Sequence, residues 1–452
     1  MKYSLNTYKL YKDESIFAMI MRIRVVMKEK VDVKKLKSAV NIAIKRYPYF
    51  AVRVGLDEDG GYVLASNPEE VVILGRTRRL PRLGSRAVNE HLLFVQCEGR
   101  EVNFYISHAL CGGRGAQPWV MTTVYQYIIE RYHVVPNAPA IRKPDSPLLP
   151  GEAEEPTIDM LGKDQPIFRY KSKKPAILGV DYLNGMYNPF KRKPNFRLYT
   201  FAQKDILSFA KNNDSSVASF FLVVTAKALD KVLPEKIRVI GGETAHNPAA
   251  SLGMPHSHID LLSHVHLDYT REQLQWDMEK LGTMTRGQIA LQTDPSVSFA
   301  ELRKEFCFLE ELETIHGQKQ KLTYFKKHDP YEGKNAQHGT FIANYTGWMD
   351  WGEVADYVDS FVFIVEGHVL LEVSSLGDRI FLSFMQLLDV KKYTDAFEAV
   401  LKELGIPFQA EGPFPKRLTK HKLPREKTPS ACFRNHPKNG CDHPLPPDDA
   451  RP

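Results

Sequence analysis

The sequence predicts an α/β protein of two similar lobes. Strands and helices alternate in the first half of the chain, and the second half repeats the order strand, helix, hairpin strands, helix. At 452 residues the chain is too long for one ordinary compact core. We therefore expect an α/β (α+β) fold in which each lobe is a mixed β-sheet with flanking helices and a cleft lies between the lobes. The expected division is 1–165, 166–415 and a basic tail, 416–452, which we expect to be disordered.

The first half begins with an apolar strand and a capped helix. Asp32 is a good N-cap for the helix that follows it, because its carboxylate accepts hydrogen bonds from the first free N–H groups. Two hairpins follow, each closed by a turn rich in glycine or acidic residues. In order, the expected elements are a strand at Ile16–Lys28, a hairpin of Phe50–Gly55 and Tyr62–Ala65, a second hairpin of Leu92–Gln96 and Val102–Ser107, and a helix at Ala116–Tyr132.

A proline-rich stretch separates the halves. Seven prolines and little periodicity between Pro136 and Pro166 predict a crossover segment starting near residue 136, with no packed element of its own. The second half then gives strands at Phe196–Gln203 and Lys236–Ile240, a helix at Ser219–Val232, long helical stretches at Arg271–Leu291 and Phe299–Phe325, a meander of Phe361–Glu366, His368–Ser374 and Ile380–Gln386, and a closing helix at Val390–Leu404.

Composition excludes several classes of function. The net charge is +7, but nine Lys/Arg and four Asp/Glu lie from Lys416 onward, so the body is nearly neutral and lacks the basic face of a nucleic-acid-binding protein. The most apolar window, Ile16–Met27, is interrupted by two arginines, which argues against a membrane span. Five scattered cysteines do not form a disulfide framework, so we expect a reducing, cytoplasmic location.

The most informative stretch runs from Ser107 to Gly113. A histidine, His108, stands where an apolar alternating strand gives way to a glycine-rich turn and a long helix. Imidazole titrates near neutrality, so this placement suits proton transfer. The glycines Gly112 and Gly113 leave room for a substrate to come close. The alternative is that His108 is a hydrogen-bonded structural residue.

The chain here resembles the coenzyme-A-dependent acyltransferase superfamily, which includes chloramphenicol acetyltransferase, condensation domains of nonribosomal peptide synthetases and alcohol acetyltransferases. The family motif His-x-x-x-Asp-Gly is matched by His108 and Gly113, with Gly112 standing where aspartate is expected. The run Tyr345–Asp350, followed by Gly352-Glu353, resembles a structural strand of the second lobe. The run Phe381–Gln386 resembles another late strand.

This resemblance implies an acyltransferase with an active-site tunnel between its two lobes and His108 as the general base. The base would deprotonate a hydroxyl or amine acceptor, which attacks the thioester of acyl-CoA or acyl-phosphopantetheine; these are co-substrates, and no tightly bound cofactor or metal is expected. The partners are then a small-molecule acceptor and an acyl thioester, with an acyl carrier protein as an alternative donor. The other expected substrate-binding residues are Gly112 and Gly113 through their amides, Tyr345 and Ser383 as hydroxyl donors, and His258 as a lining residue.

Gly112 also supports a second hypothesis. In the family the motif aspartate is structural and pairs with an arginine, so its loss leaves Arg22 and Arg24 as candidate unpaired partners. A protein that lost this residue could retain the fold as a catalytically impaired binding or scaffold protein. Retention of His108 favours the enzyme.

Three weaker patterns carry other chemistry. Cys111 lies close enough in sequence to His108 to suggest a Cys-His nucleophile, but buried cysteines are commonly inert. Two pairs, His256/His258 and His264/His266, offer four imidazoles to zinc if they lie on neighbouring strands, or else they are polar residues of the interlobe cleft. The tail holds zinc-ligand types at unusual spacing, at Cys432, His436, Cys441 and His443.

Overall fold

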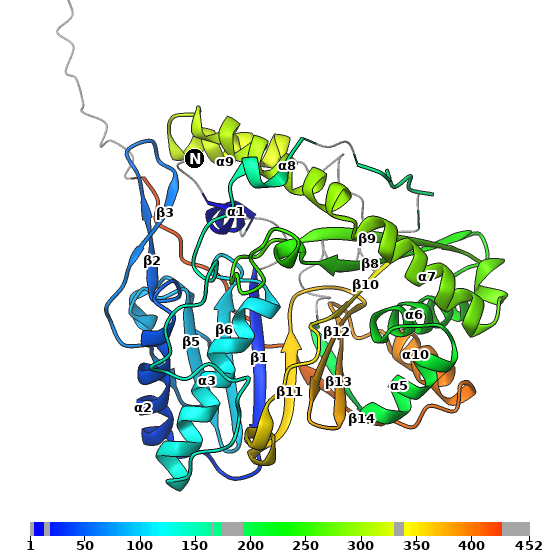
Figure 1. Ribbon diagram of the computed structural model, residues 1–452, viewed down its shortest axis with the longest axis horizontal. Coiled ribbons are helices and arrows are strands. Elements are labelled where there is room, and N and C mark those ends of the chain that lie inside the picture. Colours follow the sequence, from blue (N-terminus) through cyan, green and yellow to red (C-terminus); the bar gives the residue numbers. More distant parts are fainter. Residues whose placement is uncertain are drawn as a thin grey trace, which may run out of the picture.

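A computed structural model describes residues 4–12, 19–163, 166–173, 175, 193–329 and 339–426. It contains two large sheets side by side, as Figure 1 shows, and the predicted α/β class is confirmed. The first sheet has the strand order β11-β1-β6-β5-β4 and the second the order β14-β7-β13-β12-β10-β8-β9. The strands of the first sheet are β1 (Ile20–Met27), β4 (Ile73–Leu74), β5 (Leu93–Glu98), β6 (Glu101–Ser107) and β11 (Val358–Ile364).

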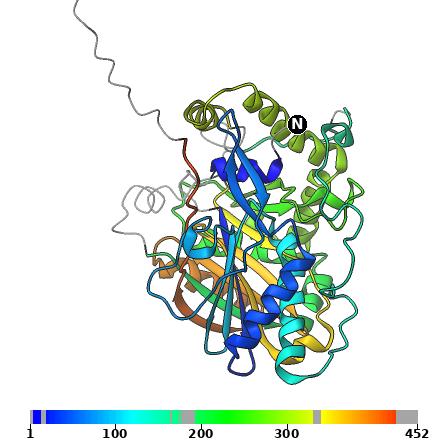
Figure 2. The same cartoon turned by 90° about the vertical axis from the view of Figure 1, so that its left-hand side faces the viewer.

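Helices cover the first sheet on its outer face, which faces the viewer in Figure 2. Asp32 caps the first of them as predicted, its carboxylate accepting from the amides of Lys34 and Lys35. The predicted hairpin after this helix is present as a separate two-stranded sheet. These elements are α2 (Val33–Ala43), α3 (Gly113–Tyr132), β2 (Val52–Leu56) and β3 (Tyr62–Ser66).

The second sheet is flanked by helices of its own. A capping box between Ser216 and Ser219 starts the most apolar helix, whose residues are buried on nearly all sides. The strands are β7 (Asn195–Ala202), β8 (Val239–His246), β9 (Ser263–Thr270), β10 (Phe341–Tyr345), β12 (Leu370–Leu376), β13 (Arg379–Gln386) and β14 (Gln409–Pro415); the helices are α5 (Gln203–Asn212), α6 (Val217–Val232), α7 (Met278–Gln292) and α10 (Lys391–Glu403).

The predicted meander after residue 360 is wrong in its pairing. Strand β11 forms no ladder with β12; it pairs antiparallel with β1, so that Phe363 lies opposite Ile23, and it thereby completes the first sheet. A segment of the second half of the chain therefore belongs to the first lobe, and the expected boundary at 165/166 does not hold for it. Both β1 and β11 are buried on both faces, which is why neither shows a clean alternation of polar residues.

Two other predictions fail where tertiary packing overrides local composition. The proline-rich crossover is packed, because Ala138, Ile141 and Glu152 are almost wholly buried. The start of the tail is packed too, since Leu83 forms a bridge with His421 and Lys416 is 2% exposed. The rest of the tail, from residue 427, lies outside the described residues.

A short N-terminal helix, α1 (Leu5–Lys12), lies over the end of the first sheet, beneath α8 (Pro295–Glu313) and α9 (Gln318–His328) in Figure 1. All residues from Leu5 to Tyr11 are buried, and Tyr8 packs edge-on against Phe308. The helical stretch predicted over 299–325 is broken between α8 and α9, where Gly317 takes a φ of +86°.

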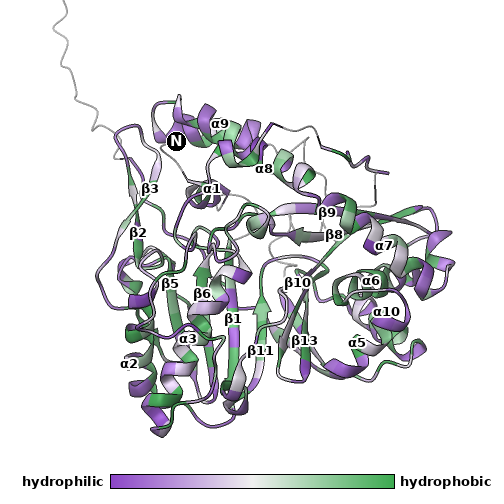
Figure 3. Ribbon diagram, viewed as in Figure 1, coloured by the Kyte–Doolittle hydropathy of each residue, from purple (hydrophilic) through white to green (hydrophobic). Residues whose placement is uncertain are grey.

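Apolar residues line the interior of both lobes, and polar residues dominate the outer surface of α9 (Figure 3). One hydrophobic cluster joins residues from both halves of the chain, including Phe104 of β6, Phe306 of α8 and Phe361 of β11. The lobes therefore share a core. Among the described residues no helix is both long and apolar enough to span a bilayer.

Candidate active site

His108 lies directly after β6, at the end of the first sheet. Its backbone N–H donates to the Met19 carbonyl at 2.9 Å, and the hydroxyl of Ser107 accepts from the Ala109 N–H at 3.0 Å and contacts His421 Nε2 at 2.7 Å. The imidazole is thus set on a turn held from two sides. Its side chain is 18% exposed, but Nδ1 is buried, so the exposed surface belongs to other atoms of the side chain.

Asp260 approaches the buried side of the His108 ring. Its Oδ2 lies 3.6 Å from His108 Nδ1, a charge contact slightly too long for a hydrogen bond, and 3.5 Å from Lys9 Nζ. Burial alone would raise the pKa of Asp260, but the charge of Lys9 and the contact with His108 lower that pKa to about 2. The same neighbours act on Lys9: against the effect of burial, the carboxylates of Asp260 and Glu305 raise the pKa of its ammonium group.

The second lobe contributes a further buried acid beside His108. Glu372 of β12 accepts a hydrogen bond at 2.8 Å from the side-chain amide of Asn344 on the neighbouring β10, and its charge interacts with His108. Burial raises the pKa of Glu372 to about 7, while Asn344 and His108 act in the opposite direction. A carboxyl group that titrates near neutrality thus faces the imidazole from across the lobe interface.

The glycines after His108 make close contacts. Gly112 is the N-cap of α3, with φ of −77°, and a Cβ there would lie 2.4 Å from Asp260 Oδ1. A Cβ at Gly113 would meet Phe363 and Thr346 at ordinary distances of 3.5 and 3.7 Å. The structure therefore brings His108, Gly112 and Gly113 together with the end of β10, where Tyr345 precedes Thr346. The predicted strand Tyr345–Asp350 is wrong in extent, because β10 ends at Tyr345.

Ser383 and His258 have other roles. The Ser383 hydroxyl is fully buried and donates to the Phe363 carbonyl, which links β13 to β11. The His258 ring stacks on Tyr49 at 3.9 Å between centroids, its Nδ1 lies 2.7 Å from the Glu152 carbonyl oxygen, and burial lowers its pKa to about 4. Both side chains are engaged in these packing contacts, and their part in substrate binding stays a prediction.

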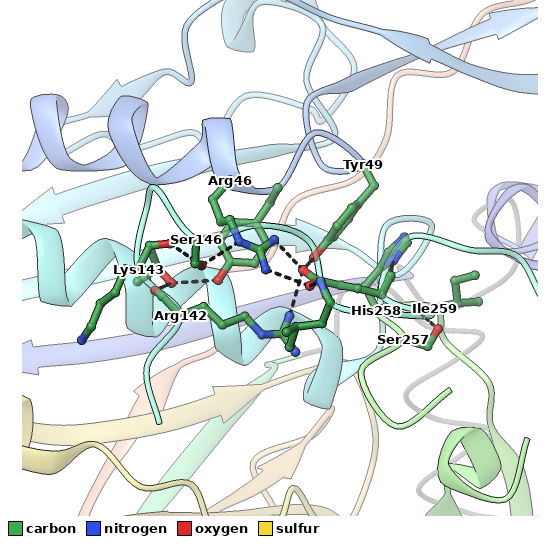
Figure 4. A network of polar contacts seen from close by, with 12 residues as sticks. Arg46, Tyr49, Arg142, Lys143, Ser146, Ser257, His258 and Ile259 are labelled. Carbon is green, nitrogen blue, oxygen red and sulfur yellow. Dashed lines mark hydrogen bonds and ion pairs between the residues drawn. The ribbon is translucent and has the colours of Figure 1, made fainter. Parts of the chain in front are cut away.

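His258 belongs to a network of polar contacts with Arg46, Tyr49 and Arg142, which Figure 4 shows. The partner that these residues share is Glu152. Arg46 binds its carboxylate through two hydrogen bonds of 2.8 and 2.9 Å, Arg142 lies 2.9 Å away, and the Tyr49 hydroxyl donates at 2.5 Å. Although burial would raise it, these donors lower the pKa of Glu152 to about 2. The network fixes the segment 256–262, on which Asp260 sits two residues after His258.

The competing chemistries find little support. Cys111 is fully buried, and burial raises its thiol pKa well above the ordinary value, which opposes nucleophilic use. His264 of β9 lies 2.7 Å from the carboxylate of Glu243 on β8, whereas the His258 ring contacts the Glu152 carbonyl oxygen. One histidine of each pair is therefore held by a different partner. Within the described ranges no group of three or more His, Cys, Asp or Glu residues could hold a metal ion. The tail residues Cys432 to His443 lie outside those ranges.

Arg22 and Arg24 both have a carboxylate partner. Glu101 binds Arg22 Nη2 at 2.8 Å and Arg24 Nε at 2.7 Å, so the expectation of unpaired arginines is wrong. Sequence reasoning missed the residues that surround His108 instead: Lys9, Asp260 and Glu372 come from segments more than 100 residues apart in the sequence. The one local signal was Gly112 itself, a missing carboxylate whose place another segment fills.

Two cavities lie elsewhere. One of about 800 Å³ lies between β1 and the second sheet and includes Arg24, Arg100 and Arg379, each facing a carboxylate. It reaches Val26, six residues along β1 from the end next to His108, or roughly 20 Å at about 3.3 Å per residue. A second, of about 290 Å³, lies beside β9. His108 lines neither of them.

Comparison with solved structures identifies the fold. No family model matches the chain, and no curated protein matches its sequence. TRI101 of F. graminearum, solved with ethyl coenzyme A, is similar over 91% of this chain and 99% of its own, with 10% identity and a TM-score of 0.56. TRI3, a trichothecene 15-O-acetyltransferase from Fusarium sporotrichioides, matches over 89% and 94%, with 11% identity and a TM-score of 0.56.

A condensation domain has the same architecture. The first condensation domain of the CDA synthetase matches over 89% of this chain and 94% of its own, with 10% identity and a TM-score of 0.52. Identities this low report on architecture and not on individual residues. The protein therefore has the same fold as TRI101, TRI3 and this condensation domain.

Proposed function

We propose that this protein is an acyltransferase that moves an acyl group from a CoA or carrier-protein thioester to a hydroxyl or amine. The observation that carries the proposal is the setting of His108. It follows a buried strand, its Nδ1 is buried against Asp260, and the rest of its side chain is partly exposed. A fold used for acyl transfer supports the same conclusion.

In this reaction Nε2 of His108 takes the proton of the acceptor O–H or N–H. The acceptor atom attacks the thioester carbonyl carbon, and the carbonyl electron pair moves to oxygen to give a tetrahedral intermediate. The intermediate collapses, the C–S bond breaks, and the departing sulfur takes the proton from the imidazolium. The products are an ester or amide and a free thiol, and the base returns to its starting state.

The oxyanion needs hydrogen-bond donors near the turn. The amides of Gly112 and Gly113 open α3, where N–H groups have no partner within the helix. The hydroxyl of Tyr345, at the end of β10, is a second candidate, and burial raises its pKa, which keeps the phenol protonated and able to donate. Ser383 drops out because its hydroxyl is already donated to Phe363.

Either thioester donor is compatible with the site. Solved structures of this fold include one with ethyl coenzyme A and a condensation domain of a synthetase. The arginines of the large cavity are matched by carboxylates, so that cavity favours neither CoA nor an acidic carrier protein. The described cysteines Cys97, Cys111 and Cys307 are free thiols, the state that a reducing compartment such as the cytoplasm maintains.

The test is release of free thiol from a panel of acyl-CoAs and acyl-phosphopantetheine carriers, each with candidate alcohols and amines. An acceptor-dependent release supports the enzyme. Tight binding of a thioester with no release for any acceptor would instead favour the binding or scaffold protein that Gly112 suggested.

A further inference from the structure

The turn after His108 is shaped around a segment from the second half of the chain. A Cβ at Gly112 would lie 2.4 Å from Asp260 Oδ1, and one at Gly115 would lie 2.3 Å from the His258 carbonyl oxygen. The φ of Gly112 is −77°, which any residue adopts, so the backbone does not demand glycine there. Space is what limits a side chain at Gly112, because the atom in its way belongs to the Asp260 carboxylate.

That carboxylate is buried between two cations or potential cations. Asp260 is 2% exposed and lies 3.5 Å from Lys9 Nζ and 3.6 Å from His108 Nδ1. Its Oδ1 and the Nδ1 of His108 are both buried, and neither makes a hydrogen bond among the described residues. The carboxylate and the imidazole face each other through Oδ2 and Nδ1 at 3.6 Å, so a small approach gives a hydrogen bond, and a positive charge on the imidazole favours that approach.

We propose that Asp260 is a positioning residue for His108, supplying from a distant segment the carboxylate that position 112 lacks, with Lys9 of α1 as its counter-ion. This inference rests on the proposed acyl transfer for its catalytic meaning. Asp260 holds Nδ1 in its protonated form, leaves Nε2 free to accept the acceptor's proton, and stabilises the imidazolium until the proton passes to the departing thiolate.

The charges around the site support this assignment of roles. Lys9 is 5% exposed on a helix that is buried along its whole length, so its ammonium group is directed at carboxylates and not at solvent. The titratable groups that interact with His108 or Asp260 include Lys9 from α1, Cys111, Glu305 from α8 and Glu372 from β12. Of these Lys9 is the cation, which fixes Asp260 as an anion and leaves it able to stabilise a charged imidazole.

The direct test uses full-length protein labelled with ¹⁵N-histidine. The imidazole signals of His108 are assigned by their loss in His108→Gln. We expect Nδ1 to be protonated and Nε2 unprotonated in the wild type, and we expect Asp260→Asn to shift the balance toward protonated Nε2. Asp329→Asn is the matched control, because Asp329 is equally buried and lies 3.8 Å from Lys12 of the same helix. A His108 signal unchanged by Asp260→Asn overturns the inference.

A kinetic readout separates positioning from folding. We expect Asp260→Asn to lower kcat about tenfold at unchanged KM and to move the acid limb of the kcat/KM profile to lower pH, because the imidazolium has lost its carboxylate. If Asp260→Asn fails to fold, Lys9→Met/Asp260→Leu removes both charges together and is measured in its place. An unchanged profile overturns the inference.

The two proposals can fail separately. If no thioester reacts but the NMR signals move as expected, acyl transfer is wrong and the contact with Asp260 stands. If thiol release depends on His108 while both the signals and the pH profile ignore Asp260, acyl transfer stands and the positioning role is wrong.

Discussion

The carboxylate of Asp260 occupies the space that a side chain at Gly112 would need, with Oδ1 2.4 Å from where the Cβ would lie. The two residues are 148 positions apart in the sequence and meet because segment 256–262 packs along the start of α3. The glycine and the aspartate therefore depend on one another. This relationship replaces the simpler idea that position 112 had merely lost a side chain.

The first prediction compares two adjacent glycines. Gly112→Ala should destabilise the protein by about 1–3 kcal/mol, because the new methyl group overpacks a site whose neighbour is a buried carboxylate. Gly113→Ala should change stability by less than about 1 kcal/mol, since its contacts would be of ordinary length and alanine favours a helix. Chemical denaturation measures both. Equal losses for the two variants would show that Asp260 does not fill the space.

A charge exchange extends this comparison. Gly112→Asp should be worse than Gly112→Ala, because it adds a second buried carboxylate beside Asp260. The double variant Gly112→Asp/Asp260→Gly moves the carboxylate to the other segment and should recover much of the loss. If the losses in unfolding free energy of Gly112→Asp and Asp260→Gly simply add in the double variant, the carboxylate does not exchange places between the two segments.

The second prediction concerns Glu152→Gln. The change leaves Arg46 and Arg142 without their buried partner, so it should cost about 3–5 kcal/mol near neutral pH. The pKa of Glu152 is lowered to about 2 in the folded protein, so its stabilisation is present above the ordinary glutamate pKa and is lost as pH falls toward 2. The difference in unfolding free energy between wild type and variant should shrink on acidification. A difference independent of pH would refute the account.

The third prediction concerns Glu372→Gln, a second Glu-to-Gln substitution, at a residue whose pKa is raised and not lowered. Burial raises the pKa of Glu372 to about 7, so between the unfolded pKa and pH 7 the unfolded state loses a proton that the folded state keeps. Stability should fall as pH rises through this window. Glu372→Gln should remove that loss and be more stable than wild type by about 3 kcal/mol at pH 8, with no gain at pH 4. A variant that is less stable than wild type at pH 8 would contradict this expectation.

The fourth prediction concerns the thiols. Among the described cysteines Cys97, Cys111 and Cys307 only Cys307 is exposed, so a maleimide should label it before the other two in the native protein. Cys111→Ala should keep acyl transfer, because a fully buried thiol with a raised pKa is not the nucleophile. Mass spectrometry locates the label, and thiol release measures the activity. Loss of activity on labelling Cys111 in folded protein would revive the Cys-His hypothesis.

The sequence predicted features that depend on neighbouring residues better than features that depend on contacts between distant segments. Elements set by local pattern were predicted well: the Asp32 cap, the hairpin that delivers His108 and the helix α3 all lie within a few residues of their expected bounds. Features set by packing were missed. The pairing of β11 with β1, the burial of Glu152 in a proline-rich stretch and the packing of His421 against the first lobe all join distant segments.

The site divides in the same way. His108 and the glycines were found because chemistry and turn geometry coincide in one short stretch. Asp260 lies between the two histidine pairs in the sequence, but no local pattern connects it to position 112. Arg22 and Arg24 were expected to be unpaired. Their ion pairs with Glu101 across β1 and β6 follow from strand register, which periodicity alone does not predict.

The central claim is that His108 is the base of an acyl transfer, and one comparison tests it most directly. Thiol release with the best donor and acceptor is measured for wild type and His108→Ala, alongside donor binding and Tm. Because a base acts in the transition state, the account predicts that release falls by at least about 100-fold while donor binding and Tm stay nearly unchanged. Equal rates, or a loss of activity that only follows a loss of folded protein, would contradict it.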